Sequence, residues 1–220
     1  MAITLSTGAT IAIAKTYLPA LGSAATATTA LSNASECVVT ATHSLVAGDY
    51  VVMASGWGLL DQRVARVKSV STTVSFVLEG VDTSDTNKYP ATTGVGTFRK
   101  INTWSTLSQV KGISASGGAQ QFADITSITD TVIRQIPTVK DAVNMTIDVF
   151  DDPTLTWYAD VIAADTARSP YALLMTFPNG SKLVANAYWS VMKVPTMETN
   201  QALMTQISLS YAAEPVRYSS

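Results

Sequence analysis

The chain has one cysteine, one histidine and little charge for its 220 residues. A single cysteine excludes an intrachain disulfide and a multi-cysteine metal site. Asp, Glu, Lys and Arg make up 14% of the sequence, against about 25% in an ordinary soluble domain. Disorder does not account for this, because disordered chains combine high charge with low hydrophobicity, and 47% of this chain is hydrophobic. We therefore expect much of the surface to be buried against other subunits, with a Ser/Thr-rich monomer surface as the alternative.

An excess of positive charge and long apolar runs are also missing. The 14 Lys and Arg residues are outnumbered by 16 Asp and Glu residues, which leaves a net charge of −2 and excludes tight nonspecific binding to nucleic acid. No apolar run approaches the ~20 residues that cross a bilayer, and residues 1–5 lack the basic and apolar regions of a signal peptide. We expect no membrane partner, and a protein made in a cytoplasm that stays soluble until it assembles.

The sequence contains none of the common catalytic motifs, such as a phosphate-binding loop, a dinucleotide fingerprint or a nucleophile elbow. Cys37 and His43 could form a nucleophile–base pair, but no third group is placed to orient the histidine. The loop with Asp82 and Asp85 offers oxygen ligands, yet it lacks the glycine and glutamate of a calcium loop. We predict no catalytic, metal or cofactor site, and a protein that is not an enzyme.

The strongest local signal is the alternation of apolar and polar residues that is typical of half-buried strands. It is clearest at 143–149, where Val143, Met145, Ile147 and Val149 share one face, and it recurs at 203–211. Two further alternating runs flank Pro178-Asn179-Gly180, and Asn-Gly tolerates the positive φ angles of a tight turn. The sequence therefore predicts a β-hairpin over 171–190.

One helix is predicted beside these strands. Asp151 and Asp152 offer a carboxylate cap, and Pro153 suits the first helical position, where its missing N–H costs nothing. Apolar residues then recur at helical spacing, at Leu155, Tyr158 and Ile162. The pattern predicts one α-helix over about 153–164, and a short second helix is an option around 130–135.

Residues 35–101 have a different texture from the rest of the chain. They contain short β-type runs separated by frequent turns, at 38–41, 50–54, 64–70, 74–78 and 96–101. We predict that 35–101 is an inserted small all-β module, and that 1–34 and 102–220 together form the core domain. The Thr/Ala/Ser-rich segment 20–35 is interpreted as a linker or a flexible loop.

Outside the predicted module, six stretches follow one another in a recognisable order. They are a small-residue turn into a strand at 6–14, a strand at 103–113, a Gly-Gly turn leading to Asp124-Ile125-Thr126, the run 136–149, the turn 177–180, and Val194-Pro195 before the strand 203–211. In this order and spacing, 1–34 and 102–220 resemble the major tail tube protein of a long-tailed (siphovirus-type) bacteriophage.

The resemblance implies a mainly β fold, a two-sheet β-sandwich or barrel with one flanking α-helix. It also implies a structural virion protein of the phage tail, made in the host cytoplasm, that assembles into hexameric rings stacked as a tube for DNA ejection. The implied partners are further copies of the chain, a tape measure protein, tail terminator and distal tail or baseplate proteins, and DNA in transient nonspecific passage. No cofactor is implied.

Particular residues follow from this expectation. A tube wall that is neutral or negative lets DNA slide, whereas a basic wall would hold it, so Asp130, Asp141 and Asp148 are lumen-facing candidates. Within the resembling stretches, Asp124, Thr126 and Trp104 are self-assembly candidates.

A second hypothesis comes from another class of protein. The chain could be a carbohydrate-binding or adhesin-like β-sandwich of a virion, with Trp57 or Trp104 as a stacking platform for sugars.

Overall fold

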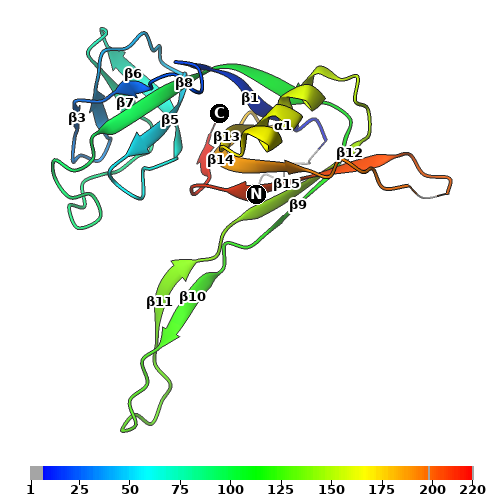
Figure 1. Ribbon diagram of the computed structural model, residues 1–220. Helices are drawn as coiled ribbons and strands as arrows, with labels where there is room; N and C mark the ends of the chain where they lie inside the picture. Colours follow the sequence, from blue (N-terminus) through cyan, green and yellow to red (C-terminus); the bar gives the residue numbers. More distant parts are fainter. Residues whose placement is uncertain (1–6, 198, 220) are drawn as a thin grey trace.

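The computed structural model describes residues 7–197 and 199–219. Within these residues the fold is mainly β, with one α-helix and two sheets, a large one and a two-stranded one (Figure 1). The mainly β fold with one helix is confirmed. The helix is α1 (Thr156–Ala167), and the strands are β1 (Thr10–Leu18), β2 (Thr26–Ala27), β3 (Ala30–Leu31), β4 (Val38–Thr40), β5 (Tyr50–Ser55), β6 (Val64–Ser71), β7 (Ser75–Leu78), β8 (Gly96–Leu107), β9 (Val110–Ser116), β10 (Gln120–Asp124), β11 (Gln135–Lys140), β12 (Asn144–Phe150), β13 (Tyr171–Thr176), β14 (Lys182–Val191), β15 (Met204–Tyr211) and β16 (Val216–Tyr218).

The large sheet runs in the order β3-β4-β7-β6-β5-β8-β1-β13-β14-β15-β12-β9, with β2 added beside β8 and β16 beside β14. The long strand β8 joins its two halves. Its first part, from Gly96 to Lys100, pairs with β5, and its second part, from Lys100 to Leu107, pairs with β1. One continuous strand therefore belongs both to the predicted module and to the rest of the fold.

The body of the fold, formed by β1, β9, β12–β15 and the second part of β8, closes around one apolar core. The sheet curves back on itself, so residues of β1 and β13 pack with residues of β12, β14 and β15 in a single cluster. Met145, Ile147 and Val149 of β12 are all buried, as their alternation predicts. Helix α1 lies over this body and adds Trp157 and Val161 to the same core (Figure 1).

The hairpin predicted over 171–190 is present as β13 and β14, paired antiparallel. Gly180 takes the positive φ of 80° that its turn requires. The strand expected at 203–211 is β15, which pairs with both β12 and β14. Residues 1–5, and Ser6 of the expected opening strand, lie outside the described residues, and β1 begins at Thr10.

Helix α1 begins at Thr156, so the predicted start near 153 and the predicted aspartate cap are wrong. Leu155 is the N-cap, and no side chain caps the helix. Asp152 is engaged elsewhere, because its Oδ1 accepts hydrogen bonds from the backbone N and the Oγ1 of Thr154, at 3.1 and 2.6 Å. This local turn engages the Asp152 carboxylate in place of capping, and the helix begins about one helical turn later in the sequence than predicted.

Two other local predictions are corrected. Residues 130–135 form no helix; 130–134 are irregular with a bend at 131–132, and Gln135 begins β11. The segment 20–35 is not a plain linker, because β2 pairs with β8 and β3 pairs with β4.

Residues 37–98 bury a second apolar cluster of their own, which includes Trp57, Phe76 and Leu60. The short strands expected there are present as β4–β7 and the first part of β8. We keep the name "module" for residues 35–101, whose standing as a separate domain remains a prediction. A third cluster, with Tyr17, Tyr50 and Tyr218, lies where the module meets the body, and we call this contact the seam.

Candidate assembly surfaces

A two-stranded hairpin stands away from the body (Figure 1). In the described part of the chain, strands β10 and β11 pair only with each other, and we call residues 117–142 the arm. The arm carries seven large apolar side chains that are exposed: Phe122, Ile125, Ile128, Val132, Ile133, Ile136 and Val139. Ile128, in the turn at the far end, is fully exposed.

Apolar side chains lie on both faces of the arm. Phe122 is opposite Pro137 on one face, and Ala123 is opposite Ile136 on the other. A free two-stranded hairpin is marginally stable in water at best. The arm therefore leaves apolar surface exposed on both of its faces.

Asp124 and Thr126 shape the far end of the arm. The Asp124 Oδ1 accepts hydrogen bonds from the backbone N and the Oγ1 of Thr126, at 2.8 and 2.5 Å. Thr126 Oγ1 in turn accepts from the backbone N of Arg134, which closes the loop. These bonds favour the charged carboxylate, so the pKa of Asp124 lies below its ordinary value, mainly through the Thr126 hydroxyl. Within the chain, these hydrogen bonds of Asp124 and Thr126 give the far end of the arm its form, and a role for the two residues in self-assembly stays a prediction.

Asp141 and Gly117 fix the base of the arm. The Asp141 carboxylate accepts from Gln121 Nε2 at 2.8 Å through each oxygen, and its backbone N donates to Ala119 O. Gly117 has a φ of 84°, and a Cβ there would lie 2.0 Å from the carbonyl oxygen of Ala142. Only glycine suits this crossing, so the direction of the arm depends on it.

The three lumen-facing candidates do not come together in one chain. Asp130 lies at the far end of the arm, where its Oδ2 accepts from the backbone N of Ser127 at 3.0 Å. Asp141 lies at the base of the arm, and Asp148 lies on β12 in the body. Asp148 Oδ1 accepts from Gln206 Nε2 of the neighbouring strand at 3.2 Å. A shared role for the three remains a prediction.

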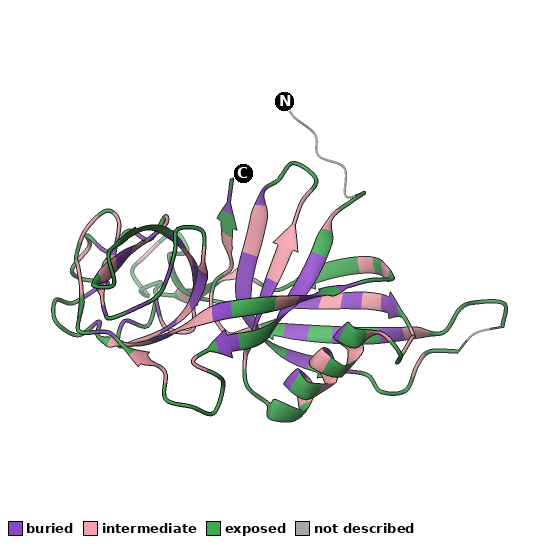
Figure 2. Cartoon of the chain, turned by 90° about the horizontal axis from the view of Figure 1, so that it is seen from above, coloured by how far each residue is buried: buried purple, intermediate pink, exposed green. Residues whose placement is uncertain are grey.

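Around Asp148 the sheet presents a face of small polar side chains. The register aligns rows across β9, β12, β15 and β14, and Figure 2 shows buried and exposed residues alternating along the strands of the body. We call these rows the polar face: Ser116, Asn144, Ser210 and Tyr188; Ser114, Thr146, Ser208 and Ser190; Gly112, Asp148 and Gln206. Within these rows the one charge is Asp148, and Lys111 lies at their margin, with its Nζ 3.2 Å from Sδ of Met204.

Strand β9 forms an edge of the large sheet. Among the described residues it pairs with β12 only, from Val110 to Ser116. An edge strand offers backbone N–H and C=O groups to any further strand. Hence a seven-residue edge beside the polar face is available for pairing with another chain.

The two candidate sugar platforms lie inside the chain or partly so. Trp57 is 2% exposed, and its Nε1 donates to Pro90 O at 2.8 Å, so its proposed role as a surface platform is wrong. Trp104 is half-buried at the seam, with its ring edge-on to Tyr50 at 6.0 Å between centroids. Nothing in these contacts resembles an open stacking surface.

The residues considered for chemistry also have structural surroundings. Cys37 is fully buried, and burial raises the pKa of its thiol. His43 Nδ1 accepts from the backbone N of Leu45 at 3.1 Å, and its ring lies edge-on to Phe76. Within residues 7–197 and 199–219, no group of three or more His, Cys, Asp or Glu is arranged to hold a metal ion.

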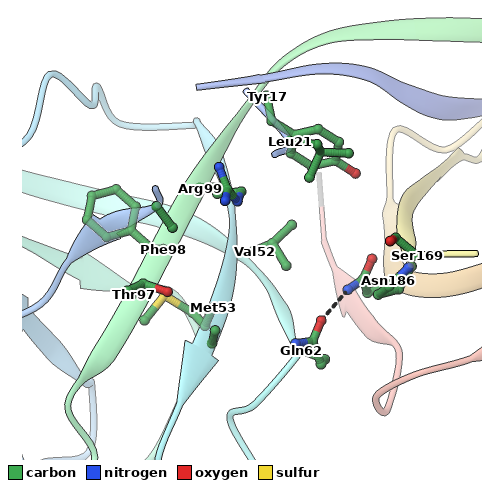
Figure 3. Close-up of a pocket in the computed structure, with 13 residues that line it drawn as sticks. Tyr17, Leu21, Val52, Met53, Gln62, Thr97, Phe98, Arg99, Ser169 and Asn186 are labelled. Atoms are coloured by element: carbon green, nitrogen blue, oxygen red, sulfur yellow. Dashed lines mark hydrogen bonds between the residues drawn. The ribbon is translucent and has the colours of Figure 1, made fainter. Parts of the chain in front are cut away.

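A small cavity of about 150 Å³ lies at the seam (Figure 3). Its lining includes Tyr17, Val52, Arg99 and Asn186. Asn186 Nδ2 donates to Gln62 Oε1 at 3.2 Å across the seam. Small-molecule sites usually measure about 300–1,000 Å³. This cavity is smaller than that, so we attribute it to incomplete packing at the seam and not to a substrate site.

These features favour a structural β subunit that contacts other chains. The sequence matches the family model described as "Phage tail tube protein, TTP" over residues 55–220, more than half of the chain. The chain therefore belongs to the phage tail tube protein family, whose members are structural components of the virion tail. The matched stretch includes the second part of the module.

Solved structures with a similar course of chain include the anti-feeding prophage tube-terminating cap, at 20% identity and a TM-score of 0.37, covering 49% of this chain and 79% of that one. A chain of the PVC sheath–tube complex of an extracellular contractile injection system matches at 17% identity and a TM-score of 0.37, covering 49% and 80%. No curated protein matches the chain significantly.

In the part of the chain that the structure describes, no helix is long and apolar enough to cross a membrane.

Proposed function

We propose that copies of this chain assemble into hexameric rings, and that the rings stack into the phage tail tube through which DNA is ejected. The observation that carries the proposal is the arm, whose seven exposed apolar side chains have no cover within the described chain. Family membership supports the tube, and the arm supplies a physical reason for copies to associate.

The energy at stake is large enough to drive assembly. Fully burying a large apolar side chain contributes about 1.5–3 kcal/mol. Association costs about 4–15 kcal/mol in lost freedom, so several of the arm's side chains buried together can offset it. Because both faces of the arm are apolar, one arm can pack between two surfaces of neighbouring copies.

Pairing of sheet edges would close each ring. Strand β9 of one copy would pair along its outer edge with a strand of the next copy. In a closed head-to-tail ring, every such edge would then be paired. The polar faces of the copies would then form one continuous inner wall.

Such a wall suits the passage of DNA. Its hydroxyl and amide groups and the Asp148 carboxylate offer no cation that would displace counterions from DNA phosphates. Asp130 and Asp141 would add negative charge to the lumen if the arms line it. The further proposed partners are a tape measure protein inside the tube and terminator and distal tail or baseplate proteins at its ends. Synthesis in the host cytoplasm belongs to the same proposal.

The test is electron microscopy of the purified protein, where we expect tubes or six-fold rings. Replacing Ile128 and Ile133 with aspartate should abolish tubes and leave a folded monomer, because two charges then face the apolar contact. Val74→Asp is the matched control, since Val74 is also exposed but lies on the module. A parent protein that stays monomeric under every condition contradicts the proposal, and so do tubes that persist with the arm variant.

A further inference from the structure

The last described strand of the body, β16, reaches toward the module. It pairs antiparallel with β14, with Val216 opposite Val184 and Tyr218 opposite Lys182. Arg217, between them, turns to the body. Its Nη2 donates to Ser181 Oγ at 3.2 Å, and its guanidinium lies 4.6 Å from the Phe177 ring centroid.

The Tyr218 side chain, in contrast to that of Arg217, contacts the module. Its hydroxyl accepts a hydrogen bond from the backbone N of Arg66 in β6, at 2.9 Å. The Arg66 guanidinium lies over the Tyr218 ring, 4.6 Å from its centroid. With 5% exposure, Tyr218 is one of the buried aromatic residues of the seam.

The Arg66 side chain is itself held in place. Its Nε and Nη2 donate to the two carboxylate oxygens of Glu79 at 2.5 Å each, so the guanidinium is gripped in a two-point ion pair. Glu79 follows β7, so two strands of the module present one rigid cation to the ring. Such cation–π contacts contribute most where water is excluded.

The remainder of the seam is less well satisfied than a protein core. Among the described residues, two buried side-chain atoms have no hydrogen-bond partner there, Arg63 Nε and Asn186 Oδ1. The cavity of about 150 Å³ opens at the same joint. In protein cores, buried polar atoms are nearly always paired and the packing is dense. The unpaired atoms and the cavity therefore indicate that the seam is packed less completely than a core.

We propose that Tyr218 is a clasp that holds the module against the body, and that without it the module turns about β8. Strand β8 is the continuous connection between the two parts, and the clasp contacts the module through β6, away from that connection. The clasp fixes the direction in which each copy presents its module. This property belongs to the single chain and does not depend on the proposed assembly.

Distances between two spin labels test the clasp. Thr86→Cys on the module and Ala163→Cys on α1 are exposed positions, and native Cys37 is fully buried and stays unlabelled. Labelled protein is diluted into unlabelled protein, so that only distances within one chain are measured, whether or not tubes form. We expect one narrow distribution in the parent and a clearly broader one after Tyr218→Ala.

Arg217→Ala is the matched control, because Arg217 sits on the same strand but contacts only the body in the bonds described above. It should leave the distribution narrow. An unchanged distribution after Tyr218→Ala, or a parent distribution that is already broad, overturns the clasp.

Two milder variants keep the test decisive if Tyr218→Ala does not fold. Tyr218→Phe keeps the ring and removes only the acceptor for the Arg66 N–H, so amide exchange at Arg66 should speed up by about fivefold, as expected for one lost hydrogen bond. Glu79→Gln weakens the grip on Arg66 and should broaden the distance distribution. Unchanged exchange in the first variant, or an unchanged distribution in the second, contradicts the inference.

Discussion

The arm and the module both project from the same body, but they treat apolar side chains in opposite ways. The module buries Trp57, Phe76 and Leu60 in a cluster of its own. The arm leaves its apolar residues exposed on both faces. The module is thus stabilised by its own packing, whereas the arm gains little stability from burial within the described chain. Under the proposed function, neighbouring copies would supply the burial that the arm lacks.

The largest expected effect comes from making the same substitution in both regions. Phe76→Ala removes a fully buried ring that packs edge-on to Phe98, and should cost about 3–5 kcal/mol of unfolding free energy. Phe122→Ala, on the arm, should change the stability of the unassembled chain by less than about 0.5 kcal/mol. Urea unfolding of the two variants measures both values. Equal losses would remove the distinction between the regions.

A smaller effect is expected at the base of the arm. Gly117→Ala places a Cβ against the Ala142 carbonyl and forces a left-handed residue to carry a side chain, at a cost of about 1–2 kcal/mol. The arm should change direction, so tube yield should fall while the melting temperature of the body changes little. Gly58→Ala is the control, because a Cβ there meets nothing within 4 Å and Gly58 lies on the module, away from the arm and from β9. Electron microscopy and thermal unfolding decide, and full tube yield from Gly117→Ala would contradict the steric argument.

The smallest effect is a pH dependence confined to the far end of the arm. The folded-state pKa of Asp124 lies below the 3.8 of the unfolded chain, mainly because the Thr126 hydroxyl donates to the carboxylate. Its stabilisation is therefore complete above pH 3.8 and is lost as the pH falls through the lower, folded value. The amide resonance of Thr126 should titrate with a midpoint below 3.8, and Asp124→Asn should abolish that titration. A midpoint at or above 3.8 would refute the hydrogen-bond account.

Sequence reasoning succeeded where the signal is local. The alternation at 143–149 and the Asn-Gly turn at 179–180 specify a strand and a hairpin from neighbouring residues alone, and the structure has both. The helix start failed because Asp152 had two local uses, a cap or a turn with Thr154, and the turn prevailed.

The arm was harder to foresee for a physical reason. A half-buried strand has one apolar face, so apolar and polar residues alternate along its sequence. Strands β10 and β11 carry apolar residues on both faces, so their sequences lack this alternation. The Gly117-Gly118 pair was the one available signal, since it marks a sharp change of direction. Among the candidate residues, Asp124 and Thr126 were found in the arm, but the polar face around Asp148 required the register of four strands. The Tyr218–Arg66 contact joins residues 152 positions apart and has no local signal.

The shared strand β8 has a mechanical consequence. A force that drags on the module is carried along an unbroken backbone into β1, which pairs with β8 from Ile11 to Leu18. Antiparallel hydrogen bonds stand perpendicular to their strands, so such a load shears the whole ladder at once instead of unzipping it bond by bond. A pulling force on the module is therefore resisted by the β1–β8 pairing in the middle of the large sheet.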